Sequence, residues 1–100
     1  MSGRAVSSTS VVVAASGQVW CNLSGEAAIL SLQSGVYYGL ERVGARVWHL
    51  LQTPVAVRDI CRTVAAEYDV LPERCERDVI ALLERLAAER LIEVQDALAA

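Results

Sequence analysis

The chain is 100 residues long, 54% hydrophobic and 21% charged, which is enough to bury one core and too short for a multidomain enzyme. Its basic residues are nine arginines against twelve acids, which give a formal net charge of −3 and an isoelectric point near 5.0. That balance counts against a protein that must neutralise nucleic-acid phosphates.

The first 17 residues are rich in Ser and Ala and carry one charge, at Arg4. This composition predicts a flexible N-terminal tail, residues 1–17, that ends in a short extended piece around residues 11–14. The apolar run 11–15 is shorter than the roughly 7 to 15 residues of a signal-peptide core and far shorter than the roughly 20 of a membrane span. We therefore expect a cytoplasmic protein without a membrane segment.

Three short apolar segments separated by turn residues come next, at 19–23, 27–32 and 36–40. Gly25 and Gly35 lie in the two connections, where tight hairpins need a residue with positive φ. The pattern predicts a three-stranded antiparallel meander. In the middle segment Ala28, Leu30 and Leu32 form the more apolar face, which we expect to lie on the core.

After Leu40 the apolar spacing becomes helical. The first predicted helix ends at Pro54, the second covers about 56–68, and the third begins at Pro72, continues to about residue 90 and is followed by a short extended segment. The order predicts an α+β domain with a three-stranded antiparallel sheet followed by three helices, similar to a winged helix-turn-helix. We expect this domain to cover 18–94, with 95–100 as a C-terminal tail.

No residue pattern points to catalysis. His49 is the single imidazole and has no partner in the sequence pattern, while Cys21, Cys61 and Cys75 are too widely spaced for a zinc site and fit reduced, buried thiols. The acids are scattered among arginines, as on a solvated surface. The sequence therefore predicts no catalytic residues, no metal and no cofactor.

Two features favour a peptide ligand. The segment 36–40 ends the meander without the Lys, Pro or inward charge that usually protects a sheet edge, so it is open to a further strand unless a helix or the N-terminal tail covers it. The apolar arc of the third helix spans roughly 180°, wider than the usual core stripe of a little over 100°. One margin of that arc is available for a second surface, unless the domain itself wraps the helix on two sides. A proline at Val36 or Tyr38 is expected to abolish strand addition.

Residues 25–48, with Tyr-Tyr-Gly-Leu at 37–40 and Val-Gly-Ala at 43–45, resemble the PqqD-like family. Within that family the chain is most similar to the stand-alone precursor-recognition proteins of lasso-peptide biosynthesis. Glu-Tyr-Asp-Val at 67–70 and the leucine-rich last helix extend the resemblance, which covers about 18–94.

The resemblance implies a non-catalytic RiPP recognition element, which binds the leader of a ribosomally made precursor peptide. In the family the leader adds as an antiparallel strand to the third strand and packs against the third helix. The implied partners are this leader and a leader-removing cysteine peptidase, with the cyclase as a further candidate. Carried over by position, the implied peptide contacts are Val36, Tyr37, Tyr38, Gly39, Leu40, Cys75, Asp78, Val79 and Leu82.

Three other functions stay open at this point. A related PqqD-like chaperone serves a radical-enzyme pathway, and a structural adaptor only bridges proteins. A winged-helix regulator of DNA is disfavoured because its recognition helix, residues 73–90, would carry five acids and four arginines.

Overall fold

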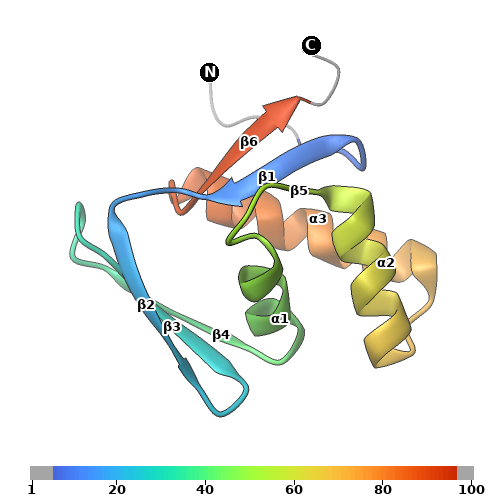
Figure 1. The fold of residues 1–100 in the computed structure, drawn as a ribbon, viewed down its shortest axis with the longest axis horizontal. Coiled ribbons are helices and arrows are strands. Elements are labelled where there is room, and N and C mark those ends of the chain that lie inside the picture. The colour runs from blue at the N-terminus through green and yellow to red at the C-terminus, as the bar shows by residue number, and fades with distance from the viewer. Residues whose placement is uncertain (1–5, 97–100) are drawn as a thin grey trace.

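The computed structural model describes residues 6–96, except for the side chain of Asp96. The elements in chain order are β1 Ser10–Ala14, β2 Gln18–Leu23, β3 Glu26–Ser31, β4 Tyr37–Glu41, α1 Val43–Leu50, β5 Val55–Ala56, α2 Val57–Tyr68, α3 Pro72–Ala88 and β6 Ile92–Asp96. They form two three-stranded antiparallel sheets and three helices (Figure 1). The predicted α+β class, the meander and the three helices are confirmed.

The meander β2–β3–β4 forms because both connections supply the backbone that a hairpin needs. Gly25 has φ 86° and Gly35 has φ 74°, in the left-handed region that a residue with a Cβ rarely adopts. The register pairs Ile29 of β3 with both Trp20 of β2 and Tyr38 of β4, so β3 is the central strand. β4 is therefore an edge strand of this sheet, with β3 on one side and no strand partner on the other within residues 6–96.

The prediction of which face of β3 is buried is wrong. Ala27 and Ile29 are 1% and 0% exposed, whereas Leu30 and Leu32 are 37% and 62% exposed. A single residue, Arg42 with φ 52°, joins β4 to α1, so the chain turns sharply and α1 packs on the side of the sheet that carries Ile29. The more apolar face of β3 is left open because this connection, and not the apolar content of one strand, decides the covered face.

The segment around β1 corrects the predicted N-terminal tail. Ser10–Ala14 is the central strand of the second sheet, in the order β5-β1-β6, and Val12 is fully buried between Val55 and Val94. The predicted extended piece exists, but these residues are part of the domain and not of a flexible tail. The predicted C-terminal tail, 95–100, is corrected in the same way, because residue 95 and the backbone of residue 96 belong to β6. Residues 1–5 and 97–100 of the two predicted tails lie outside the described part of the chain.

All three helices and both sheets contribute to the core, and α1 lies between sheet β2–β3–β4 and α2 (Figure 1). Its largest fully buried side chains include Trp48 of α1, Ile60 of α2 and Leu83 of α3. Pro72 begins α3, where its missing N–H costs no hydrogen bond. Among the described helices none is both long and apolar enough to cross a membrane.

Candidate functional site

A groove runs between β4 and α3, and we call it the β4–α3 groove. It consists of two adjoining cavities of about 260 and 390 Å³, and Tyr38 and Glu89 border both. The remaining lining residues of the first cavity are Tyr37, Gly39, Leu40, Leu82, Arg85 and Leu86, and those of the second are Ser31, Gln33, Ser34, Val36, Ala88 and Arg90. One wall is therefore a sheet edge and the other a helix.

The backbone of β4 has no strand partner on its groove side within residues 6–96. The Ser31 N–H donates to the Val36 carbonyl at 3.0 Å, and the Arg42 N–H donates to the Gly25 carbonyl at 3.1 Å. In an antiparallel pair, bonded and non-bonded residue pairs alternate. Given the register, the even-numbered residues of β4 bond to β3, and the odd-numbered residues between them do not.

Three residues of β4 therefore direct their backbone N–H and C=O groups to the free edge: Tyr37, Gly39 and Glu41. β1, which belongs to the predicted tail, pairs in the other sheet and does not cover this edge. The expectation that proline at Val36 or Tyr38 removes an edge donor is wrong. The Tyr38 N–H is on the β3 side of the strand, and the Val36 N–H donates to Ser34 Oγ at 3.2 Å. The N–H groups that do point to the free edge belong to the next residues along the chain, Tyr37 and Gly39.

Glu89 joins the two walls of the groove. The Tyr38 hydroxyl donates to Glu89 Oε1 at 2.8 Å, across 51 positions of sequence. This hydrogen bond, together with partial burial and the negative charge of Glu89, raises the pKa of Tyr38. The phenol therefore stays protonated through the neutral range and holds the last turn of α3 against β4.

The structure brings six of the nine predicted contact residues together at the groove: Val36, Tyr37, Tyr38, Gly39, Leu40 and Leu82. Asp78 is exposed but lines neither cavity, and Val79 and Cys75 are only 2% and 3% exposed. The Cys75 thiol points to α2, where it donates to the Cys61 carbonyl at 3.6 Å. The apolar arc of α3 is packed on α2 along this margin, which helical spacing alone does not reveal.

Sequence reasoning missed Arg85, Leu86 and Glu89 on the helical wall. They follow Leu82 at positions i+3, i+4 and i+7, the spacing of residues on one face of a helix. Once Leu82 is assigned to the groove, this spacing predicts that the other three residues line the same wall. The assignment of peptide contacts to individual residues stays a prediction.

The cysteines differ in environment. Cys21 is exposed on β2, whereas burial raises the pKa of Cys61 to about 11 and also raises the pKa of Cys75. The expectation of buried cysteines is thus wrong for Cys21, which lies on the uncovered face of its strand.

Because the thiolate is the reactive form, iodoacetamide at about pH 8 is expected to alkylate Cys21 and to spare Cys61 and Cys75 in the folded chain. Intact-protein mass spectrometry should show one adduct, and three after denaturation. Labelling of Cys61 should rise as the pH approaches its raised pKa of about 11. Three rapid adducts on the folded chain at about pH 8 would contradict this arrangement.

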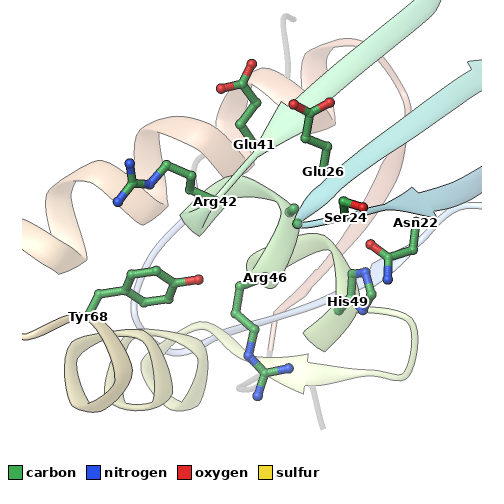
Figure 2. A pocket seen from close by; sticks show the side chains of 10 residues that line it. Asn22, Ser24, Glu26, Glu41, Arg42, Arg46, His49 and Tyr68 are labelled. Atoms are coloured by element: carbon green, nitrogen blue, oxygen red, sulfur yellow. The ribbon is translucent and has the colours of Figure 1, made fainter.

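A third cavity, of about 470 Å³ and lined mostly by polar and charged side chains, lies between the β2–β3 turn, the end of β4 and α1 (Figure 2). Figure 2 shows Glu26 and Glu41 pointing to one side, away from Arg46 and His49. Arg46 donates two hydrogen bonds of 2.9 Å to Glu67, which lower the pKa of that carboxyl. His49 packs edge-on against Trp20 at 5.0 Å between ring centroids. Within residues 6–96 no three metal-binding side chains cluster.

The outer face of sheet β2–β3–β4, opposite α1, is open, and most of its side chains are apolar. Val19 and Leu23 are each 51% exposed, and Tyr37 is 66% exposed. The register places side chains from all three strands on this outer face: Val19, Cys21, Leu23, Ala28, Leu30 and Tyr37. Glu26 and Glu41 pair beside Leu23 and lie on the same face, so two carboxylates border its apolar part. An exposed apolar area with a polar border is typical of a protein-binding surface.

Comparison with known proteins places this geometry in a family. The family described as "Coenzyme PQQ synthesis protein D (PqqD)" matches residues 26–92, which include both walls of the β4–α3 groove. The chain belongs to the PqqD family. The resemblance seen in the sequence is thereby confirmed.

Among solved structures, this PqqD-family chain is similar to TbiB1 in complex with the TbiA(beta) leader peptide. The two chains are 34% identical, the match covers 81% of this chain and 94% of the other, and the TM-score is 0.77. A search of curated proteins finds no match.

Proposed function

We propose that this chain is a non-catalytic recognition protein of lasso-peptide biosynthesis, which binds the leader of a precursor peptide as an additional strand on β4. The carrying observation is the unpaired edge of β4, which faces a groove walled by α3. Its similarity to a protein solved with a leader peptide bound supports the same ligand class here.

Strand addition accounts for the composition of the groove. The backbone groups of Tyr37 and Gly39 provide ladder hydrogen bonds that do not depend on the sequence of the ligand. Alternate side chains of the added strand would point toward α3, where Leu82 and Leu86 offer an apolar wall. Affinity would then come from the backbone and the apolar wall, and selectivity from the side chains along the groove.

The test is a titration with a synthetic leader peptide, taken from the precursor gene beside the gene for this chain and followed by backbone amide NMR. Saturable shifts are expected at residues 37–41 and along α3 from Leu82 to Glu89. A scrambled leader of the same composition is the control. Shifts confined to the polar cavity near His49, or no saturation, would contradict the proposal.

The second part of the proposal is delivery of the bound leader to a cysteine peptidase. An adaptor needs a surface apart from its ligand groove, and the outer face of sheet β2–β3–β4 provides one. We propose that the peptidase docks on this face. Binding to both would raise the local concentration of the leader at the enzyme without catalysis by this chain.

The alkylation rate of Cys21, which is exposed on the outer face, measures whether a partner covers this face. The peptidase encoded in the same gene cluster is expected to slow alkylation of Cys21, whereas leader peptide alone should leave the rate unchanged. Leu30→Asp, on the same face, should restore the fast rate in the presence of peptidase while leader affinity is kept. An unchanged Cys21 rate at a peptidase concentration that supports leader removal would exclude this face as the docking site.

A second candidate function follows from the family description, which names a protein of coenzyme PQQ synthesis. A leader-binding module for a radical-enzyme pathway would use the same groove and differ in its partner. Protection of Cys21 by a radical enzyme from the gene cluster, and not by a peptidase, would favour that candidate.

A further inference from the structure

The β4–α3 groove has a charge that differs in sign from the whole protein. Its charged lining residues are Arg85, Glu89 and Arg90, whereas the chain carries a formal net charge of −3. Two cations against one anion make the groove locally positive. An acidic protein would otherwise repel an acidic peptide.

The two arginines are available to a ligand. In the described part of the chain the ion pairs are Arg46 with Glu67 and Arg62 with Asp59, and neither Arg85 nor Arg90 takes part in one. Glu89, which precedes Arg90 directly and follows Arg85 by one helical turn, accepts the hydrogen bond from Tyr38. Arg85 precedes Glu89 by four residues, which is the less favourable order for a helical ion pair.

The arginines are distributed along the whole groove. Arg85 lines the first cavity, beside Gly39 and Leu82, and Arg90 lines the second, beside Val36. A strand added to β4 would pass the first arginine and then the second. Each guanidinium would meet carboxylates at a partly apolar wall, where paired hydrogen bonds to a carboxylate are stronger than in open water.

We propose that the groove selects peptides with acidic residues, and that Arg85 and Arg90 each bind one carboxylate of the added strand. The inference rests on the proposed peptide-binding function and names the chemistry that such a peptide must carry. Complementary charge at the edge of an interface contributes specificity more than affinity. The ladder hydrogen bonds hold the strand, and the arginines discriminate between strands.

The test uses a displayed library of random peptides about 15 residues long, more than enough for one added strand. Peptides selected on the wild-type chain are expected to be enriched in Asp and Glu. Selection on the Arg85→Glu/Arg90→Glu double variant should remove that enrichment and favour Lys and Arg. Arg77→Glu, an exposed α3 residue that lines neither cavity, is the matched control and should leave the acidic preference unchanged.

A charge exchange then tests one contact. For an acidic peptide from the wild-type selection, Arg85→Glu is expected to weaken binding about tenfold, and an acid-to-Lys change in the peptide should recover most of the loss. Circular dichroism verifies that each variant is folded. Enriched peptides without acids, or an acidic preference that survives the double variant, overturn the inference and leave peptide binding intact. Failure to enrich any peptide overturns the proposed function and this inference together.

Discussion

Replacing Tyr37 by proline is expected to weaken leader binding about ten- to hundredfold while the chain remains folded. The Tyr37 N–H lies at the free edge of β4, so proline removes a donor that pairs only with the added strand. The leader carbonyl that it would serve is left without a partner, which costs about 1–3 kcal/mol of binding free energy. Isothermal titration with the leader measures the loss, and circular dichroism measures the fold.

Two neighbouring variants make this prediction specific. Tyr38→Pro removes a bond to β3 and is expected to lower the free energy of unfolding, because Tyr38 is paired with Ile29 inside the sheet. Gly39→Ala keeps its N–H, and a Cβ at Gly39 meets no atom within 4 Å, so leader affinity should be retained. A folded Tyr37→Pro variant with wild-type affinity would exclude strand addition at this edge.

Val12→Asp is expected to lower the free energy of unfolding by more than about 3 kcal/mol, because it buries an unpaired charge. Val12 is 0% exposed in the central strand of sheet β5-β1-β6. A flexible tail at this position would tolerate the change without loss. Urea denaturation followed by tryptophan fluorescence gives the comparison with wild type.

Thr9→Asp is the matched control, because Thr9 is exposed in the turn before β1 and the change should stay within about 0.5 kcal/mol. If Val12→Asp does not fold, Val12→Ala still tests the point, with an expected loss of about 2 kcal/mol from reduced apolar burial. An unfolding midpoint equal to wild type in Val12→Ala would show that β1 adds no stability.

The sheet edge of the candidate site was predictable from local pattern. Alternating apolar residues, glycines at Gly25 and Gly35, and the absence of protective residues in 36–40 all act over a few positions of the chain. The helical wall was not predictable to the same degree. Leu82 lines the groove, whereas Cys75 lies against α2, since the rotation of α3 about its axis depends on contacts with another helix.

The sequence by itself determined the types and order of most elements, the antiparallel meander and the open strand, because these depend on spacing and turn residues a few positions apart. Tertiary structure alone decided three further points. β1 is a central strand, and the local pattern could not reveal this because its partners Val55 and Val94 are far away in the chain. Arg42 set the covered face of β3 through its positive φ. Packing of α3 on α2 turned Arg85 and Glu89 toward β4, since buried apolar contacts, and not helical spacing, fix which margin of a helix remains free.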